Sequence, residues 1–170
     1  MDTSTFQFFH MSTQAYSVGD ELCGNGRDKV DPRIENELEA RKPDRALSRR
    51  DALFSLEHTD FTLCGIAKSC YIYQIRPNGE PQRWDLTWIG EMQKALIKLK
   101  YSQYEKMNRY ADWTPELVEK CCLGYWSGAA TKTPNWEFLM KSCTVVQVIA
   151  SELVDPKTTK GGWPLSITIS

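Results

Sequence analysis

Residues 134–149 read PNWEFLMKSCTVVQVI, a polar and aromatic stretch that runs directly into an apolar one. Thr133 and Pro134 are residue types that favour a helix cap and the first helical position, so a short helical turn is expected at 134–139. The valine-rich second half is typical of a buried strand. The segment therefore brings one carboxylate, that of Glu137, to the start of a core strand.

Glu137 has two interpretations. A carboxylate beside aromatic rings at the edge of a strand is a frequent setting for catalysis, because such surroundings change its pKa. The ordinary alternative is a glutamate that is solvated or paired in a salt bridge. The fragment alone leaves both open.

The composition fits one ordinary globular domain. The 170 residues are 41% hydrophobic and 25% charged, which is enough apolar material for a core. The formal net charge of -1 predicts no overall attraction to nucleic acid or to an anionic membrane. The chain has no apolar run of about 18 residues and no signal-peptide pattern at Met1–Ser4. We therefore expect a soluble, cytoplasmic single domain over 1–170, with 155–170 as a peripheral tail and the oligomeric state open.

Cysteine usage indicates reduced thiols. None of the six cysteines belongs to a Cys-x-x-Cys pair and several lie in apolar segments, so we expect mostly buried, reduced side chains. A metal site can be drawn from His58, Cys64 and Cys70, but their five-residue gaps fit no common zinc pattern. No metal is expected.

The predicted elements follow each other without a repeated βαβ rhythm. Strands are expected at 6–11, 69–75, 143–149 and 165–169, and helices at 31–42, 48–56, 85–100 and 114–124. Asp31 and Thr114 are expected to cap their helices, and Gly124 to end the last one. This order predicts an α+β fold with a small, split, antiparallel-rich sheet and flanking helices. The sequence contains no glycine-rich dinucleotide or P-loop motif.

Two further groups are candidates for ligand binding. Ser48 and Asp51 have the spacing of a capping box, and Arg49 and Arg50 lie beside the expected helix N-terminus, a combination that favours phosphate. A cap that binds no ligand is the common alternative. Asp85 is either the cap of the next helix or a polar ligand contact.

Three fragments carry a resemblance to a known family. FFHMS at 8–12, followed by YSVGDEL at 16–22, is similar to the first strand and loop of the rifamycin-type ADP-ribosyltransferases, and YIYQIRPNG at 71–79 to a later strand and turn. NWE at 135–137, with the strand beyond it, resembles the segment that bears the catalytic glutamate in diphtheria-toxin-like ADP-ribosyltransferases. In pieces, the resemblance covers about half of the chain.

The resemblance implies an enzyme that moves ADP-ribose from NAD to an acceptor through an oxocarbenium-like transition state. His10, with Ser12 beside it, would hold NAD by its adenosine ribose or its nicotinamide amide. Glu137 would accept a hydrogen bond from the 2′-hydroxyl of the nicotinamide ribose and favour the developing positive charge. Asp85 follows the strand and turn where the rifamycin-type enzymes keep an aspartate, so it competes for the acidic role.

The resemblance also implies contacts for the rest of NAD. Tyr125 or Trp126 would stack on the nicotinamide ring, because aromatic rings offer flat, apolar faces. Arg49 or Arg50 would pair with the pyrophosphate through the guanidinium fork.

Three positions depart from the family pattern. Met11 follows the histidine where a glycine is common, and the second core strand, expected at Arg45-Ala46-Leu47-Ser48, lacks the family's tyrosine or Ser-Thr-Ser motif. Asn135 stands where many protein-modifying enzymes have a glutamate, so arginine is disfavoured as the acceptor. These departures leave the stacking partner of nicotinamide open and permit an inactive descendant.

A protein of another class is the main alternative. A non-catalytic binding or inhibitor protein would use the aromatic surface around Tyr101, Tyr104 and Tyr110 as its interface. In either case the expected partner is a macromolecule, and a protein more than a nucleic acid.

Overall fold

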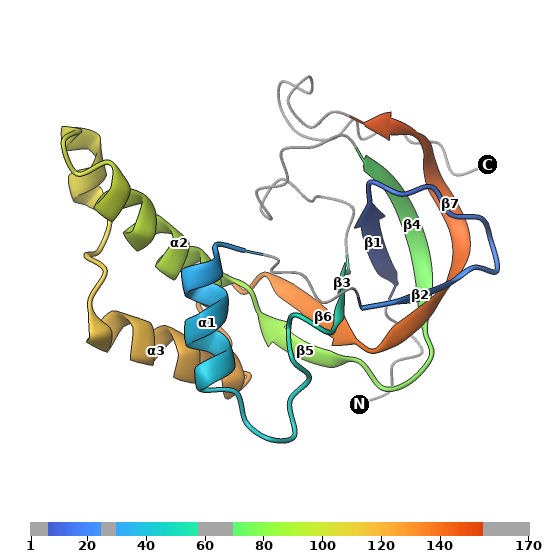
Figure 1. Cartoon of the computed structure of the whole chain (residues 1–170), viewed down its shortest axis with the longest axis horizontal. Coiled ribbons are helices and arrows are strands. Elements are labelled where there is room, and N and C mark those ends of the chain that lie inside the picture. Colours follow the sequence, from blue (N-terminus) through green and yellow to red (C-terminus); the bar gives the residue numbers. More distant parts are fainter. Residues whose placement is uncertain (1–6, 25–29, 58–69, 155–170) are drawn as a thin grey trace. The chain divides into compact units, whose positions relative to one another are not determined.

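The computed structural model describes residues 7–24, 30–57 and 70–154 (Figure 1). The chain forms two compact units, each assembled from segments that lie far apart in the sequence. The sheet unit contains described residues 7–24, 53–57, 70–81 and 140–154, and the helical unit contains 30–52 and 82–139. The predicted α+β class is confirmed. The expected strand at 165–169 and the His58 and Cys64 positions lie outside the described residues.

Five strands make the sheet unit, in the order β2-β7-β4-β1-β3. Their bounds are β1 Phe8–Ser12, β2 Glu21–Cys23, β3 Leu53–Leu56, β4 Cys70–Pro77 and β7 Ser142–Val154. All neighbouring pairs in this order are antiparallel. Three of these strands, β1, β4 and β7, occur where alternating aromatic and β-branched residues predicted them.

One face of the sheet unit is apolar. Phe9, Leu56 and Ile72 form a buried cluster there, with Met11 and Ile149 packed against it. Because successive side chains of a strand point to opposite faces, the intervening residues of β1, β3 and β4 line the other face. Shifts in the β4–β7 register mark bulges, which bend this pair of strands.

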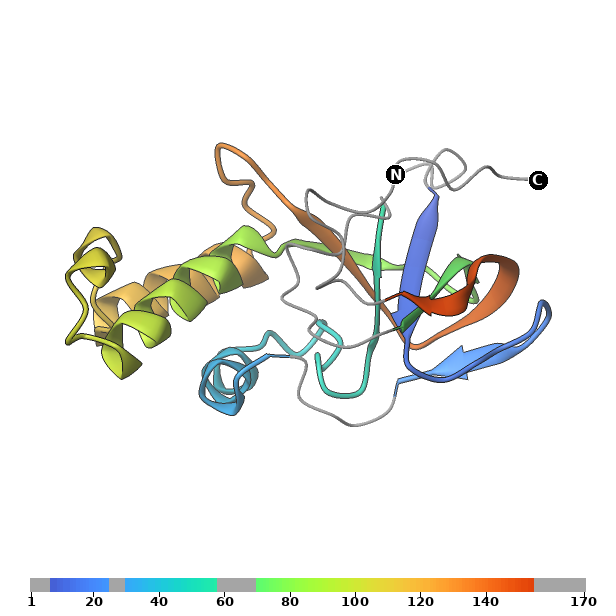
Figure 2. The same cartoon turned by 90° about the horizontal axis from the view of Figure 1, so that it is seen from above.

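The helical unit holds three α-helices and a strand hairpin. The helices are α1 Pro32–Ala40, α2 Thr87–Lys100 and α3 Pro115–Trp126, with a short 3-10 helix at Glu105–Arg109. The hairpin pairs β5 Gln82–Asp85 with β6 Trp136–Met140, of which residues to 139 belong to this unit. Figure 2 shows α2 and α3 side by side.

Capping explains where the helices begin. The side chain of Asp31 accepts a hydrogen bond from the Arg33 N–H, and that of Thr114 accepts one from the Leu117 N–H, so both predicted caps are confirmed. Gly124 does not end α3, which continues to Trp126. Instead, Gly124 is where α3 meets Trp88 of α2, since a Cβ at this position would lie 2.5 Å from the indole ring.

An apolar core joins the three helices. It is made of Ile34, Leu38, Ala46, Ile89, Met92, Leu96, Val118, Cys121, Cys122, Tyr125 and Trp126. Each large side chain buried in this way contributes about 1.5–3 kcal/mol to the free energy of unfolding. This core therefore supplies the rigid frame on which the polar side chains of the unit are mounted.

Two predicted helical segments are wrong. Residues 136–140 form strand β6, because Glu137 pairs with Trp84 of β5 and the Asn135 carbonyl accepts from the Leu86 N–H at 2.8 Å. Leu53–Leu56 forms strand β3 beside β1, and the Ser48 hydroxyl donates to Glu39 Oε1 at 3.0 Å instead of capping a helix. In both segments the pairing of backbone groups with a neighbouring strand outweighs the local capping pattern.

Cys23, Cys121, Cys122 and Cys143 carry free thiols. Cys121, Cys122 and Cys143 are buried, while Cys23 is exposed. Burial raises the pKa of the thiols of Cys121 and Cys122 to about 11 and that of Cys143 to about 12. These three side chains therefore behave as apolar core residues rather than as nucleophiles.

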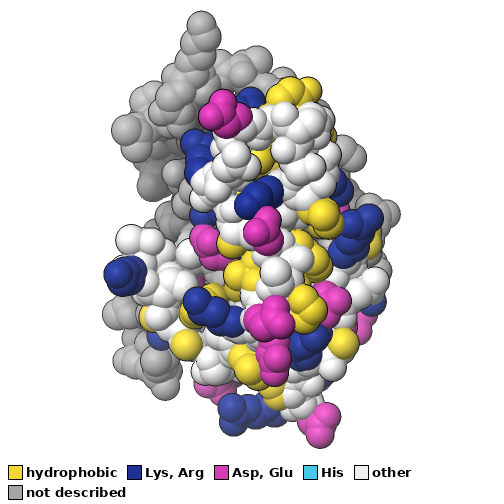
Figure 3. Space-filling view, turned by 90° about the vertical axis from the view of Figure 1, so that its left-hand side faces the viewer, with side chains coloured by type: hydrophobic (Ala, Val, Ile, Leu, Met, Phe, Trp, Pro, Cys, Tyr) yellow, Lys and Arg dark blue, Asp and Glu magenta, His cyan; other side chains and the backbone are white. Residues whose placement is uncertain are grey.

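The surface over the helices mixes charges of both signs. Figure 3 shows acidic and basic side chains interspersed with apolar ones, and surface ion pairs join Lys94 to Glu91 and Lys100 to Asp31. Such pairs contribute little to stability and give no strong field of one sign. Within the described part of the chain, no helix combines the length and apolar character needed to cross a bilayer.

Candidate functional site

The first group of candidate residues lies on the polar face of the sheet unit. Across β1 and β4, His10 is opposite Tyr73 and Ser12 is opposite Tyr71. Across β1 and β3, Phe9 is opposite Leu56, and one step along this antiparallel register sets His10 opposite Ser55. Residues directly opposite each other share one face of a sheet. We call His10, Ser12, Ser55, Tyr71 and Tyr73 the polar face.

His10 is held in one orientation by the backbone of β3. Its Nδ1 lies 2.7 Å from the Phe54 carbonyl oxygen. A carbonyl oxygen only accepts, so Nδ1 carries the hydrogen, and in the neutral imidazole Nε2 is then the accepting nitrogen. The ring is half-buried, in the middle of β1 and not at its end as expected. His10 is thus a fixed acceptor on a strand.

Ser55 and Tyr73 differ in how their hydroxyls are used. The Tyr73 hydroxyl donates to the Gln14 carbonyl at 3.1 Å and accepts from the Tyr16 N–H at 2.9 Å, so it fastens the loop after β1. The Ser55 side chain is 1% exposed, and its Oγ has no hydrogen-bond partner among the described residues. A buried hydroxyl without a partner costs free energy, and such groups are found where a ligand or water completes them.

Sequence reasoning missed Ser55. The second core strand was expected at Arg45-Ala46-Leu47-Ser48, which is wrong, since these residues form no strand and Leu53–Leu56 pairs with β1 instead. The capping-box spacing of Ser48 and Asp51 pointed to a helix that does not form. Ser55 therefore lies on a strand where a helix was expected.

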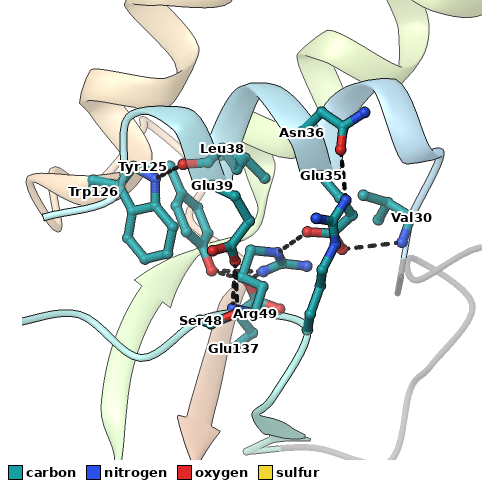
Figure 4. Close-up of polar contacts among 11 residues, drawn as sticks. Val30, Glu35, Asn36, Leu38, Glu39, Ser48, Arg49, Tyr125, Trp126 and Glu137 are labelled. Carbon is teal, nitrogen blue, oxygen red and sulfur yellow. Dashed lines mark hydrogen bonds and ion pairs between the residues drawn. The ribbon is translucent and has the colours of Figure 1, made fainter. Parts of the chain in front are cut away.

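The second group of candidate residues is a buried ion cluster inside the helical unit (Figure 4). Helix α1 supplies Glu35, the segment after it supplies Arg49, α3 supplies Tyr125 and β6 supplies Glu137. Arg49 Nε donates to Glu35 Oε2 at 3.1 Å, and Arg49 Nη1 donates to the Tyr125 hydroxyl at 2.6 Å. Arg49 Nη1 also pairs with Glu137 Oε1, to which the Tyr125 hydroxyl donates at 2.5 Å.

Burial makes the charged groups of this cluster costly in free energy unless they are paired with one another. The side chains of Arg49, Glu35 and Glu137 are each at most 2% exposed. Burial raises the pKa of Glu137 above its usual range, although Arg49 and Tyr125 act in the opposite direction. Burial and the nearby Glu137 likewise raise the pKa of Tyr125 well above 10, with Arg49 acting against them. The cluster therefore depends on the single cation of Arg49.

The structure gives Arg49 and Arg50 roles other than an exposed anion site. No helix begins at Ser48, so the predicted helix N-terminus does not exist. The guanidinium of Arg49 is enclosed by its carboxylate partners, and Arg50 Nη2 donates to Asn36 Oδ1 at 2.6 Å. The predicted pairing of Arg49 with pyrophosphate would have to break a buried ion pair.

The rings of Tyr125 and Trp126 are occupied by the protein itself. Trp84 stacks on Tyr125 with ring centroids 5.7 Å apart and meets Trp126 edge-on at 5.2 Å. The Trp126 indole N–H donates to the Leu38 carbonyl at 2.8 Å. Both side chains are buried in the helical core, so the predicted stacking on nicotinamide does not suit them.

Asp85 and Glu137, the two candidate acids, use their oxygens differently. Asp85 Oδ1 accepts from the N–H groups of Thr87 and Asn135, both at 3.0 Å, and Oδ2 accepts from that of Thr131 at 2.7 Å. Burial would raise the pKa of Asp85, but the Thr131 and Thr87 amides bring it below its usual range. Asp85 therefore supports the start of α2 and the loop before β6.

The two carboxylate oxygens of Glu137 differ in their hydrogen-bond partners. Arg49 and Tyr125 both donate to Oε1, and no residue in the described ranges donates to Oε2. The salt-bridged interpretation of Glu137 is thus correct.

The structure therefore collects the candidates in two places. Arg49, Tyr125 and Glu137 meet in the buried ion cluster with Trp126 beside them, and Asp85 has its own network in the helical unit. His10 and Ser12 belong to the polar face of the sheet unit. In comparisons with known proteins, no family model, no curated protein and no solved structure matches this chain.

Proposed function

We propose that this protein transfers ADP-ribose from NAD to an acceptor and that the polar face of the sheet unit binds the NAD. The single observation that carries the proposal is the pairing of a fixed histidine on β1 with an unpartnered buried serine on β3. The proposal also draws on the resemblance to rifamycin-type and diphtheria-toxin-like ADP-ribosyltransferases, which implies a site histidine on the first strand. A split, antiparallel sheet of that family's type is part of the proposal.

On the polar face, the hydrogen-bonding groups suit a nucleotide sugar and an amide. The resemblance implies that His10 contacts a ribose hydroxyl or the nicotinamide amide, and the Ser55 hydroxyl supplies a donor or an acceptor. Both lie on paired strands, so their relative position is set by the sheet and not by a mobile loop. Preorganised groups of this kind bind without a large cost in side-chain ordering.

The reaction needs an anion to favour the developing oxocarbenium ion. The glycosidic C–N bond breaks with its electron pair going to nicotinamide, and the acceptor forms the new bond to the anomeric carbon as it loses a proton. In the enzymes that the chain resembles, a catalytic glutamate accepts a hydrogen bond from the ribose 2′-hydroxyl, and its charge favours the cationic sugar. Removing one such group typically lowers the rate by about 100-fold or more.

The acceptor in this proposal is a macromolecule in the cytosol. A protein suits a chain of net charge -1 better than a nucleic acid does, because binding to phosphate backbones relies on excess positive charge. The free thiols of Cys23 and Cys121 match a reducing compartment.

A second candidate function is non-catalytic binding to another protein. It is supported by the exposed apolar and aromatic side chains Ile97, Leu99, Tyr101 and Tyr104, which are 44–54% exposed in the helical unit. Clusters of exposed aromatic residues are typical of interfaces. An enzyme that modifies a protein also needs a docking surface, so the two functions are compatible.

Nicotinamide release tests the proposal. The protein is incubated with NAD labelled in the nicotinamide ring and, separately, with NAD labelled in the adenylate together with a cell extract. We expect wild-type protein to release nicotinamide and label a macromolecule, and His10→Ala to lose about 100-fold of the rate. Arg41→Gln, which removes a surface ion pair in the same chain, is the control and should keep full activity.

Wild-type protein that releases no nicotinamide, but binds a partner tightly through the exposed aromatic surface, would favour the binding function instead.

A further inference from the structure

We propose that the buried ion cluster is a pH-sensitive element, in which Glu137 takes up a proton as the pH falls from neutral to mildly acidic values and thereby stabilises the helical unit. All of the groups involved belong to the helical unit. The effect requires neither a ligand nor the proposed function.

Glu137 lies where an ionised carboxylate loses its hydration. Its side chain is 2% exposed, and Trp84, directly opposite in β5, stacks on the ring of Tyr125. An ion removed from water in this way is costly in free energy unless hydrogen-bond donors replace the water. The arrangement of donors around Glu137 therefore decides whether the charged or the neutral form is favoured.

Both donors of Glu137 reach the same oxygen. Arg49 Nη1 pairs with Oε1, and the Tyr125 hydroxyl donates to Oε1 at 2.5 Å. Among the residues that the structure describes, none donates to Oε2. An ionised carboxylate can accept on both of its oxygens, so this anion is compensated on one side only. A proton on Oε2 would leave both hydrogen bonds to Oε1 in place.

The guanidinium of Arg49 is shared between two carboxylates. Its Nε donates to Glu35 Oε2 at 3.1 Å, while Nη1 pairs with Glu137. On the side of α1, Glu39 Oε1 accepts from the backbone N–H of Arg49 at 2.8 Å. The cation is therefore not matched to Glu137 alone, and Glu35 brings a second negative charge close to it.

The neighbouring groups act on the titration of Glu137 in two directions. Burial raises the pKa of Glu137 and so does the charge of Glu35, whereas Arg49 and Tyr125 lower it, and the result lies above the usual range. Trp84 on β5 carries no charge. Burial raises the pKa of Tyr125 well above 10, and arginine stays charged, so neither of these two donors changes its protonation between neutral and mildly acidic pH.

The direction of the pH effect follows from the higher pKa in the folded chain. The folded protein binds more protons than the unfolded chain between the two pKa values, so stability falls as the pH rises there. The contribution of Glu137 is complete below the unfolded value of about 4.3 and is lost as the pH rises through the folded pKa. Asp85, whose pKa is lowered, has the opposite sign.

Urea unfolding curves from neutral to mildly acidic pH test the proposal. Tryptophan fluorescence follows the helical unit, which contains Trp84, Trp88, Trp113, Trp126 and Trp136. We expect wild type to gain stability on acidification relative to Glu137→Gln, which cannot ionise, so that the ratio of their unfolding constants changes by up to about tenfold per pH unit. Glu37→Gln, at a surface carboxylate paired with Arg41, is the matched control, and its ratio to wild type should stay nearly constant.

A 13C NMR titration of the Glu137 carboxyl in wild type keeps the test decisive even if Glu137→Gln does not fold. The carboxyl, assigned through bonds from the backbone, should titrate above the unfolded value of about 4.3. Tyr125→Phe removes a donor to the charged form and should raise the midpoint further. A carboxyl that titrates at or below the unfolded value, or a ratio of unfolding constants that does not change with pH, would overturn the proposal.

Discussion

The polar face of the sheet unit and the buried ion cluster of the helical unit differ in how completely their polar side chains are hydrogen-bonded. In the ion cluster, Arg49 is matched by Glu35 and Glu137, and the Tyr125 hydroxyl both accepts and donates. On the polar face, the buried Ser55 hydroxyl has no partner among the described residues. Complete pairing is what structural stability requires, whereas an incomplete set of hydrogen bonds suits a ligand that completes it.

The comparison also separates the two candidate acids. Both oxygens of Asp85 accept hydrogen bonds from backbone amides, so Asp85 is completely paired within the helical unit. Glu137 instead belongs to the ion cluster, because its Oε1 accepts from both Arg49 and Tyr125.

Replacing the cation should break the ion cluster most severely. Arg49→Leu leaves Glu35 and Glu137 buried without their partner, so we expect a loss of about 3–5 kcal/mol in the free energy of unfolding. Urea denaturation followed by circular dichroism measures it. Arg41→Leu removes a surface pair with Glu37 and should cost at most about 1 kcal/mol. Similar losses in both variants would contradict the distinction between buried and surface pairs.

Asp85→Asn should lower stability in a pH-dependent way. The substitution weakens the acceptors of three N–H groups, for an expected loss of about 1.5–3 kcal/mol at pH 7. The pKa of Asp85 is lowered in the folded protein, so its contribution is complete above the unfolded value of about 3.9 and is lost as the pH falls through the folded pKa.

Unfolding curves at several pH values between neutral and strongly acid check this sign. The difference between wild type and Asp85→Asn should shrink as the solution becomes acidic. Asp112→Asn, at an exposed aspartate paired with Lys98, is the control and should change little at any pH. A difference that grows with acidity would show that Asp85 is not ionised in the folded protein.

Gly124→Ala should disturb the apolar frame around the ion cluster. The added Cβ would lie 2.5–2.8 Å from three ring atoms of Trp88, whose indole N–H is tied to the Ala129 carbonyl at 2.8 Å. Overpacking of this kind costs about 1–3 kcal/mol. Gly90→Ala in α2 meets no atom within 4 Å and should be neutral or stabilising by up to about 1 kcal/mol. Melting temperatures that fall equally in both variants would contradict the close contact.

Ser55→Ala should have the smallest effect on stability and a clear effect on function. Removing an unpartnered hydroxyl should change the free energy of unfolding by no more than about 0.5 kcal/mol. Nicotinamide release should fall about tenfold if the hydroxyl binds NAD. Ser48→Ala, which removes the hydrogen bond to Glu39, should lower the free energy of unfolding more than Ser55→Ala does and should leave nicotinamide release unchanged. Full activity in Ser55→Ala would remove Ser55 from the site.

The alternation of residue types and the helix-capping residues predicted much of the fold. The alternation in YIYQI at 71–75 identified β4, and Asp31 and Thr114 marked the starts of α1 and α3. The segments that failed, at 48–56 and 134–139, have good local capping signals but join strands that are paired by distant residues. Local preferences amount to a fraction of a kcal/mol per residue, so pairing across the sheet outweighs them.

The ion cluster could not be foreseen from local pattern. Arg49 is 14 residues from Glu35, 76 from Tyr125 and 88 from Glu137, and only the packed helices bring these side chains together. One signal was present, since Glu35 is next to Ile34 and three residues before Leu38, which places it on the core side of α1, where a charged side chain needs a partner.

A titration with NAD followed by backbone amide NMR locates the NAD site. If the polar face binds NAD, the largest shifts fall on β1, β3 and β4 around His10, Ser55 and Tyr73, and they are weakened in Ser55→Ala and His10→Ala. Amide shifts confined to α2 and the residues around Tyr101 and Tyr104, or no shifts at millimolar NAD, would contradict it.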